Sequence, residues 1–365
     1  MESELIIHSK QYQLKRYPIT TQTSLRAWSS AELLALTYIT NKKYNTVCLY
    51  NDRFGVWNCT LHDKNPTTIW TYASQQKAIS KNLLRNGLNA NVIFKTPLDE
   101  LNTIDIALIK IPKSVALFEL FLQQIYKAAT SDTEVVCCFM TKYFSAATLK
   151  VASYYFEEVQ QTKAWKKARL IILKKAKKEA LPKLAENTDT IIWKEKQFKQ
   201  YYGVFSSSGI DVGTQFLLAN LQVKPTEKNI IDLASGNGVI AYQITQQNSK
   251  ATVTLIDDFN LAIASSKINL KGLQTHFICD NNLNTLPSHS FDLVVSNPPF
   301  HFEHENNIEV ALSLFKQVKN CLKPNGRFLL VANCHLNYKT HLSVLFKTIN
   351  VINKNNQFII YECMC

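Results

Sequence analysis

The chain has 365 residues, of which 46% are hydrophobic and 19% charged, so its composition is that of a folded protein and excludes an intrinsically disordered one. Lys and Arg number 41 against 28 Asp and Glu, a net charge of +13 that favours an anionic partner, of which nucleic acid is the commonest large one. This length predicts two domains. The longest apolar runs, such as Val135–Met140, are far shorter than the roughly 18–20 residues that span a bilayer, so we expect no membrane association.

The nine cysteines are irregularly spaced and include no C-x-x-C pair, which argues against a zinc ribbon or a thioredoxin-type site. Such a set indicates reduced thiols, and the acidic start Met1–Glu4 lacks the features of a signal peptide. We therefore expect a cytoplasmic protein. Cys363 and Cys365 form a C-x-C tail, in which we do not expect a metal.

The first half of the chain contains a layout that the second half repeats. Thr103–Pro112 resembles Ser290–Pro299, because in each an Asp precedes a Pro by seven positions with an apolar strand pattern between them. A helix pattern follows each segment, and then a strand, Glu134–Met140 in the first half and Arg327–Ala332 in the second. We interpret this as a duplicated fold, with two unrelated α/β domains as the alternative.

The positive charge is concentrated in the first half. Residues 1–190 hold 26 basic and 16 acidic side chains, a net +10, against +3 for residues 191–365. The densest patch lies beside Trp165 and has no acidic residue; it comprises Lys163, Lys166, Lys167, Arg169, Lys174, Lys175, Lys177 and Lys178. We expect these side chains to contact phosphates of RNA, although a solvated face is the simpler reading.

The segment Leu181–Lys199 is polar, contains Pro182 and lies between two apolar regions. We place the domain boundary there, which gives domains of residues 1–185 and 195–365. Beyond it, strand and helix patterns alternate. The predicted strands are Asn229–Leu233, Ala251–Asp257, His276–Cys279, Phe291–Ser296 and Arg327–Ala332, and the predicted helices are Gly238–Gln246, Leu261–Leu270 and Ile308–Leu322. This alternation predicts a parallel sheet with helices on both faces, which binds its ligand at the carboxyl ends of the strands.

Two motifs in this region indicate a nucleotide-like ligand. The segment Ile230–Gly238 runs from a strand through a small, glycine-containing loop into a helix, where backbone can approach a ligand closely, although a tight turn also uses glycine. Asp257 ends the next strand, where a carboxylate can accept both hydroxyls of an adenosine ribose. Its neighbour Asp258 is the alternative, and helix capping is the structural explanation for the pair.

The sharpest motif is Ser296–Phe300, the sequence SNPPF at the end of a strand. The Asn297 side-chain oxygen and a backbone carbonyl held stiffly by two prolines form a paired acceptor that suits a planar –NH2 group. Phe300 can stack on the ring that carries the amine. The motif therefore indicates a binding site for an amine attached to a planar ring.

Together these motifs resemble the S-adenosylmethionine-dependent amino-methyltransferases, and more narrowly the bacterial ribosomal RNA guanine-N2 methyltransferases. The narrower resemblance rests on Ser296–His301, Asn229–Ile240 and Gly203–Leu217. The stretches Ile109–Leu122 and Ala164–Leu170 are similar to the large-subunit branch of that family, methyltransferase G. The resemblance implies an α/β fold with two tandem Rossmann-like methyltransferase domains, the N-terminal one degenerate, and methylation of 23S rRNA.

The resemblance also implies roles for single residues. The target base is held by Asn297, Pro298 and Phe300. The S-adenosylmethionine is lined by Asp232, Ala234, Gly236, Gly238, Asp257, Asp280 or Asn281, and a Phe205–Gly213 loop that includes Gly209. Ala234 departs from the family pattern, which usually has Gly there. We expect one cofactor site only, because the first half lacks an equivalent of Ser235–Gly238 and has Lys110 at the place of the Asn.

The chemistry expected at the motif is mainly positioning, since the sulfonium supplies the reactivity. Guanine N2 lies on the minor-groove edge, so the target nucleotide must be unpaired or flipped. A protein glutamine N5-methyltransferase, a small-subunit 16S rRNA enzyme and a non-catalytic RNA-binding protein are the competing readings. We expect a monomer, and we expect no metal at His301, Glu303, His304 and Glu305.

Overall fold

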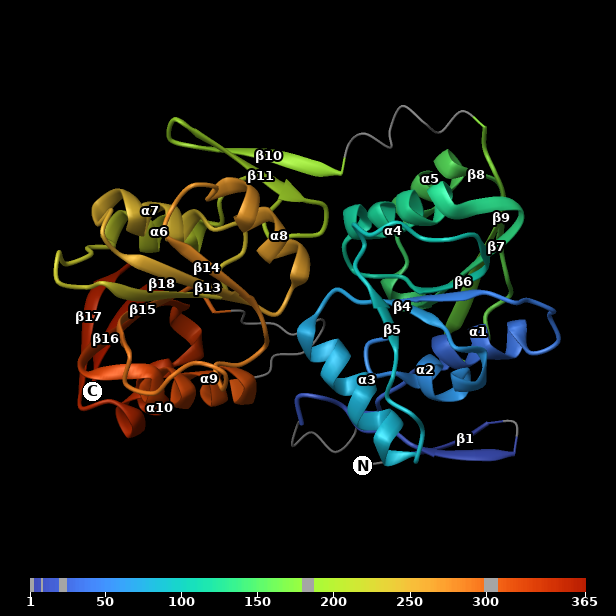
Figure 1. Cartoon of the computed structure of the whole chain (residues 1–365), viewed down its shortest axis with the longest axis horizontal. Helices are drawn as coiled ribbons and strands as arrows, with labels where there is room; N and C mark the ends of the chain where they lie inside the picture. The colour runs from blue at the N-terminus through green and yellow to red at the C-terminus, as the bar shows by residue number, and fades with distance from the viewer. Residues whose placement is uncertain (1–2, 8, 20–24, 179–186, 299–307) are drawn as a thin grey trace. The chain divides into compact units, whose positions relative to one another are not determined.

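The computed structural model describes residues 3–7, 9–19, 25–178, 187–298 and 308–365. The chain divides into two compact units, Met1–Asn187 (unit 1) and Thr188–Cys365 (unit 2), and each is built around its own sheet (Figure 1). Phe300 and the polar cluster that follows it lie outside the described residues, so the structure adds nothing to the predictions made for them.

Unit 1 alternates short strands with helices. Its strands are β1 (Glu4–Ile7), β2 (Lys10–Gln13), β3 (Val47–Tyr50), β4 (Thr67–Ile69), β5 (Ile93–Lys95), β6 (Ile104–Lys110), β7 (Ala129–Met140), β8 (Phe156–Gln161) and β9 (Ala168–Ala176). Its helices are α1 (Ser30–Ile39), α2 (Val56–Thr60), α3 (Ala73–Arg85), α4 (Val115–Ala128) and α5 (Ala146–Tyr155).

Unit 2 follows the same alternation. Its strands are β10 (Thr188–Trp193), β11 (Lys196–Tyr201), β12 (Asn229–Leu233), β13 (Thr252–Asp257), β14 (Thr275–Cys279), β15 (Phe291–Ser296), β16 (Leu322–Asn333), β17 (Thr348–Lys354) and β18 (Phe358–Met364). Its helices are α6 (Val212–Asn220), α7 (Val239–Gln247), α8 (Asn260–Asn269), α9 (Ile308–Cys321) and α10 (Tyr338–Leu345). The strands and helices predicted for this region are confirmed, most of them to within a few residues; β16 begins five residues before its predicted start.

The main sheets of the two units have the same strand order. Within the described residues each has seven strands, ordered β5-β4-β3-β6-β7-β9-β8 in unit 1 and β14-β13-β12-β15-β16-β18-β17 in unit 2. The first five strands of each order run parallel and the last two pair antiparallel. Two Rossmann-like α/β units in tandem are therefore confirmed.

The core of unit 2 lies on both faces of its sheet, because successive strand residues point to opposite sides. Ile230 packs in the cluster that α6, α7 and the end of α8 cover, whereas Ile231 packs in the cluster that α9 and α10 cover. The sheet is thus the middle of three layers. No helix in the described part of the chain is long and apolar enough to cross a membrane.

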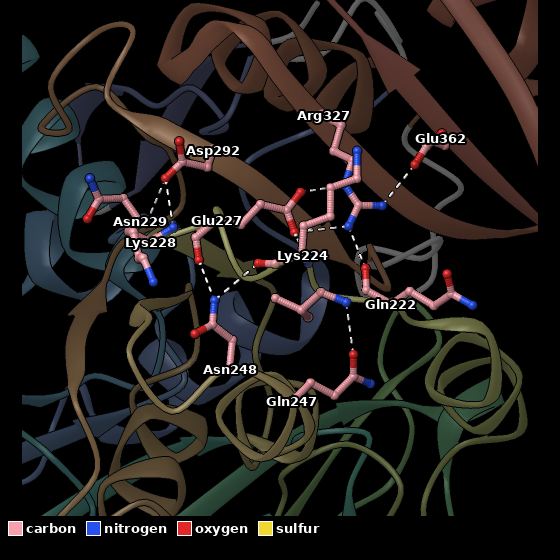
Figure 2. A network of polar contacts seen from close by, with 11 residues as sticks. Gln222, Lys224, Glu227, Lys228, Asn229, Gln247, Asn248, Asp292, Arg327 and Glu362 are labelled. Atoms are coloured by element: carbon pink, nitrogen blue, oxygen red, sulfur yellow. Dashed lines mark hydrogen bonds and ion pairs between the residues drawn. The ribbon is translucent and has the colours of Figure 1, made fainter.

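A polar network fixes the amino ends of the unit 2 strands, at the opposite edge from the predicted ligand loops (Figure 2). Arg327 is 7% exposed; its Nε donates to Glu227 Oε1 at 2.6 Å and its Nη1 to Glu362 Oε1 at 2.8 Å. Removing one member of such a buried set would leave an uncompensated charge, so we assign this network to stability.

Asp292 belongs to the same edge and explains half of the Asp-to-Pro repeat. Its Oδ2 accepts from the backbone N–H groups of Lys228 and Asn229, both at 2.9 Å, just where β12 begins. In unit 1 the Asp105 Oδ2 accepts in the same way from Asn45 and Thr46. These backbone bonds hold the pKa of Asp105 below its usual value. The repeated Asp is therefore a structural clamp.

Candidate functional site

Four neighbouring strands of unit 2 end at one edge of the sheet. Leu233 pairs with Ile256 of β13 on one side and with Ser296 of β15 on the other, and Asp257 pairs with Cys279 of β14. Because parallel strands end at a common edge, the predicted cofactor loop, Asp257 and the start of the SNPPF motif come together there. Sequence positions up to 65 residues apart thus form one site.

The loop after β12 has a conformation that depends on left-handed backbone. Gly236 has φ +54° and Gly238 φ +84°, and a Cβ built at Gly236 would meet no atom within 4 Å, whereas one at Gly238 would press on Leu270 and Ser266. The loop is held from α8, where Ser266 Oγ donates to the Gly236 carbonyl at 2.8 Å and Asn269 Nδ2 to the Asn237 carbonyl at 2.9 Å. The backbone beside Gly236 is therefore fixed and has open space in front of it.

Ala234 shares that left-handed backbone, with φ +60°. An L-residue with a Cβ is strained there by roughly 1–2 kcal/mol relative to glycine. Its N–H nevertheless donates to the Ile256 carbonyl at 2.8 Å, which ties the loop to β13. The departure from the family pattern is thus absorbed without moving the loop off the sheet edge.

Asp257 closes the loop from the next strand. Its Oδ2 accepts from the Gly236 N–H and its Oδ1 from the Phe259 N–H, both at 2.9 Å, and the side chain is half-buried. Burial raises the pKa of Asp257 to about 6, although these two bonds oppose the rise. The Asp257 carboxylate bonds the glycine loop directly, and the choice between Asp257 and Asp258 as the ribose-binding carboxylate stays a prediction.

Asp232 lies near the end of β12, next to the loop, and its role in lining the cofactor stays a prediction. It is fully buried beneath the loop, and its Oδ2 accepts from the Ala241 N–H in the first turn of α7 at 2.9 Å. Burial raises the pKa of Asp232 to about 7. Its Oδ1 and the hydroxyl of Ser235 are buried without a hydrogen-bond partner in the structure. Asp232 therefore ties the end of β12 to the first turn of α7.

Asp280 and Asn281 follow β14 at the same edge, as predicted. The Asp280 N–H donates to the Asp257 carbonyl at 3.0 Å, and its Oδ1 accepts from the Asn282 N–H at 3.1 Å. Both side chains are half-buried. Their position beside Asp257 fits a place near the adenine, and the choice between the two stays a prediction.

The segment Phe205–Gly213 is linked to the glycine loop through one buried amide. Gln200 accepts from Asn237 Nδ2 at 3.0 Å and donates to the carbonyls of Val204 and Phe205 at 3.0 and 3.2 Å. The Phe205 ring is 72% exposed. Ser206 Oγ closes the turn by donating to the Gly209 carbonyl at 2.7 Å. Gln200 is a residue that the sequence analysis missed, since nothing in its neighbourhood marks it.

Asn297 stands at the end of β15, half-exposed, and Pro298 beside it is buried. Its Nδ2 donates to Asp211 Oδ2 at 3.0 Å and to Thr214 Oγ1 at 2.8 Å, at the start of α6. Asp211 and Thr214 were not predicted as site residues. Their spacing of three, Asp then Thr at a helix start, is a capping pattern that could have indicated a buried helix end near the motif.

The basic patch of unit 1 divides into two groups along β9, and its contact with RNA stays a prediction. Lys163, Lys166 and Lys167 lie in the turn before β9, beside the carboxyl end of β7, where Ala168 pairs with Met140. The other lysines lie at the far end of the strand. There Lys174 pairs with Glu134, Lys175 with Glu158, and Lys177 Nζ donates to the Ser153 carbonyl. The interior of β9 between the two groups is buried, apart from the exposed Arg169 near its start.

Among the described residues no group of three or more His, Cys, Asp and Glu is arranged to hold a metal ion. The carboxyl edge of the unit 2 sheet offers groups that can position a ligand. It has a fixed backbone loop with space before it, a carboxylate beside that loop, and an amide oxygen on the neighbouring strand.

Comparisons with known proteins match the two units of the chain separately. Residues 2–178 match the family model described as RLMG N-terminal domain, and residues 195–362 match the one described as methyltransferase small domain. Among solved structures, the 16S rRNA N2 methyltransferase RsmC of T. thermophilus, in complex with AdoMet and guanosine, is similar over 99% of this chain and 97% of that one. The TM-score is 0.77 and the sequence identity 18%, so this likeness concerns the fold.

A methyltransferase from Mesorhizobium loti is 23% identical and covers 33% of this chain and 52% of its own, with a TM-score of 0.27. Unit 2 is a methyltransferase domain, of the kind that takes S-adenosylmethionine as its cofactor. The chain thus combines a match to an RLMG N-terminal domain in unit 1 with a match to a methyltransferase small domain in unit 2.

Proposed function

We propose that the protein transfers a methyl group from S-adenosylmethionine to the N2 amine of a guanine in 23S ribosomal RNA. The observation that carries the proposal is the position of Asn297. Because Ser296 pairs with Leu233, the Asn297 amide follows the strand directly beside the glycine loop. An acceptor for an amine and a loop for the methyl donor thus lie on adjacent strands.

The residues of the loop fit the cofactor. The space in front of Gly236 admits a group that any larger side chain would displace. Asp257 can accept from ribose hydroxyls, and the half-buried Asp280 and Asn281 can bond the adenine edge. When bound, the cofactor supplies an electrophilic methyl group on a sulfonium.

The residues of the chain then hold and orient the substrate. The Asn297 oxygen and the Pro298 carbonyl accept the two N–H groups of the guanine amine, which directs its lone pair toward the methyl group. Preorganised acceptors of this kind act on charge that develops as the bond forms. No residue has to remove a proton before transfer, since the proton can leave the product amine afterwards.

We also propose where unit 1 contacts RNA. At the carboxyl edge of its sheet three aromatic rings are exposed, Tyr143 at 46%, Phe144 at 40% and Trp165 at 39%. Lys142 lies over the Tyr143 ring at 4.5 Å and Lys166 over the Trp165 ring at 4.7 Å. The Thr141 N–H donates to the Lys167 carbonyl at 2.9 Å, which joins the two turns. Exposed rings beside lysines suit unpaired bases and phosphates.

The choice of 23S over 16S RNA rests on unit 1. Its match to the RLMG N-terminal domain and its Ile109–Leu122 and Ala164–Leu170 stretches favour the large-subunit RNA. The solved relative named for 16S RNA is similar in fold to both units, so 16S is the second candidate substrate. A protein glutamine is a weaker third, because it leaves the basic aromatic edge of unit 1 without a purpose.

The test is methyl transfer by the full-length protein with radiolabelled S-adenosylmethionine. The substrates are 23S RNA, 16S RNA and ribosomal protein from cells that lack this protein, each offered alone and within subunits. Label in 23S RNA that is released as N2-methylguanine supports the proposal. Label in 16S RNA or in protein selects the corresponding alternative. Cofactor binding without transfer to any of them would select a non-catalytic role.

A further inference from the structure

The Asn297 amide is held at its nitrogen by two residues of one helix start. Nδ2 lies 3.0 Å from Asp211 Oδ2 and 2.8 Å from Thr214 Oγ1. A primary amide has two N–H groups, and these two contacts use both of them. The nitrogen therefore has no N–H left for a substrate.

The orientation of the amide follows from the chemistry of Asp211. Oxygen and nitrogen of an amide look alike in shape, so their assignment needs a partner that discriminates between them. A carboxylate only accepts hydrogen bonds, so it attracts the NH2 end and repels the oxygen. Asp211 thereby turns the Asn297 oxygen to the opposite side, the one available to an amine.

Asp211 is itself fixed. It caps α6, and its Oδ2 also accepts from the Thr214 N–H at 3.0 Å. Gly213 lies between them, and a Cβ there would come within 3.1 Å of Asp211 Oδ2 and 3.0 Å of the Phe358 ring. Thr214 is 7% exposed. A carboxylate held by the backbone in this way has little freedom to release the amide.

We infer that Asp211, assisted by Thr214, is a positioning residue that locks Asn297 as a hydrogen-bond acceptor and so selects a donor –NH2 group at the target. The inference rests on the proposed function and adds to it the group that sets the polarity of the substrate site. If the amide were turned around, it would present N–H donors and favour a carbonyl edge over an amine.

The variants that test this are Asp211→Ser and Asp211→Asn. Serine caps a helix about as well as aspartate but is too short to hold the Asn297 nitrogen. Asparagine has a side-chain oxygen that can accept from both Thr214 and Asn297. We expect Asp211→Ser to lower the single-turnover rate by roughly 10-fold or more, the loss of one charge-assisted hydrogen bond, and Asp211→Asn to recover most of it.

Three further readouts separate positioning from a structural role. The affinity for S-adenosylmethionine and the unfolding midpoint of Asp211→Ser should stay close to those of the parent. In an Asn297→Ala background the Asp211→Ser change should have no further effect on rate, because it acts through Asn297. Rate losses that multiply in the double variant, or a rate loss matched by lost cofactor affinity, would overturn the inference.

A last readout needs no activity. The Asn297 side-chain NH2 signal in the NMR spectrum, assigned by its absence from Asn297→Ala, should exchange slowly with water and become fast in Asp211→Ser. An unchanged exchange rate would refute the geometric basis of the inference. If the parent protein methylates no RNA while this signal behaves as expected, the proposed function fails and the orientation of Asn297 stands.

Discussion

Tyr50 in unit 1 and Leu233 in unit 2 hold equivalent places at the ends of their strands. Tyr50 pairs with Ile69 and Ile109 of the neighbouring strands, as Leu233 pairs with Ile256 and Ser296. Counting on from these residues, Asn51 and Ala234 both have left-handed backbone, with φ +57° and +60°. Gly55 and Gly238, four positions later, have φ +81° and +84° and each begins a helix. The two loops therefore follow a similar course at these two positions, although Gly236 between them is left-handed and Arg53, at the equivalent place, is not.

The side chains on that shared course differ where a ligand would lie. Arg53 stands at the place of Gly236, and it is 1% exposed. Its guanidinium lies over the Tyr72 ring at 4.8 Å and donates to Ser74 Oγ at 2.9 Å. Unit 1 thus has a large buried side chain at the place where unit 2 has a glycine. Trp70 stands at the place of Asp257, so the ribose acceptor is missing as well.

The strand that carries the amide shows the same exchange. Lys110 follows Ile109 as Asn297 follows Ser296, and Lys110 Nζ pairs with Glu32 Oε1 at 3.2 Å. Glu32 is the third residue of α1 after its cap Ser29, and Thr214 is the third residue of α6 after its cap Asp211. An ion pair has therefore replaced the oriented amide at the same two positions. In both units, structural carboxylates such as Asp105 and Asp292 stabilise the fold at the amino ends of the strands. The chemistry depends on a few side chains at the carboxyl ends.

The largest effect is expected from placing in the unit 2 loop the arginine that unit 1 has at the equivalent position. Gly236→Arg should abolish detectable binding of S-adenosylmethionine, because the long side chain would occupy the open space before the loop. Gly236→Ala is the matched control, since it adds a similar backbone strain of about 1–2 kcal/mol but no bulk. Calorimetric titration of both variants gives the measurement. Equal affinities for the two variants would mean that the space is not the cofactor site.

The amide is the next largest difference between the units. Asn297→Ala should lower the single-turnover rate by about 10²–10³ and leave cofactor affinity nearly unchanged, because a positioned acceptor is lost from the substrate side only. Lys110→Met at the equivalent place of unit 1 should leave the rate at saturating RNA unchanged. The measurement is rapid-quench transfer with enzyme in excess. A near-normal rate for Asn297→Ala would remove its assigned role.

Sequence reasoning reached the second unit better than the first, for a physical reason. The glycine loop and the SNPPF motif are short contiguous segments, and each directly follows a parallel strand. Gly236, Asp257 and Asn297 therefore lie at one edge of the sheet, as predicted. The full burial of Asp232 could not be predicted, because burial depends on what packs around a residue. The division of the lysine patch could not be predicted from closeness in sequence, because a strand separates its two ends by roughly 3 Å per residue. Asp211 and Arg53 act through contacts with residues distant in sequence, which no short sequence motif indicates.

The division of the lysines predicts a difference between the two ends of β9. Changing Lys163, Lys166 and Lys167 to Glu should raise the KM for RNA and lower the log–log salt slope by about 2–3, because each lost phosphate contact removes roughly 0.7–0.9. The charge-matched control, Lys174, Lys175 and Lys177 to Glu, changes residues already engaged within unit 1 and should have the smaller effect. Salt titrations of RNA binding provide the comparison, and equal slopes for the two triple variants would restore a single surface.

The raised pKa of Asp257 predicts that cofactor affinity depends on pH. Unit 1 has Trp70 at the equivalent position, which cannot titrate. Burial raises the pKa to about 6, so the carboxylate that accepts from the ribose is protonated below that pH. Cofactor affinity should fall as pH falls through 6, by up to about tenfold per pH unit. Asp257→Asn should bind more weakly and show a flat profile. If the pH dependence of cofactor affinity stays steep in Asp257→Asn and flattens in Asp232→Asn, it is due to Asp232, whose pKa is raised to about 7.

The same shift affects stability with the opposite sense. The folded-state pKa of Asp257 lies above the usual 3.8, so the unfolded chain releases its proton first as pH rises. This carboxyl therefore lowers the free energy of unfolding between about pH 4 and 6, and Asp257→Asn should remove that decline. Urea unfolding of the cofactor-free protein across this range measures it.

The smallest effect concerns the one strained position that the two loops share. Ala234→Gly relieves roughly 1–2 kcal/mol of left-handed strain in the folded state. It also raises the conformational entropy of the unfolded chain, which destabilises the fold by about 0.4–1 kcal/mol. The free energy of unfolding should therefore rise by roughly 0.5–1 kcal/mol. Ala241→Gly, the same change inside helix α7, should lower it by about 1 kcal/mol.

In unit 1 the equivalent Asn51→Gly should be destabilising. Asparagine adopts left-handed backbone more easily, and Asn51 Nδ2 donates to the Lys110 carbonyl at 2.9 Å. Urea unfolding that resolves the two units would show opposite signs at Ala234 and Asn51. Equal signs would mean that the two loops are strained for different reasons, and that their common backbone course does not determine which residue each unit requires there.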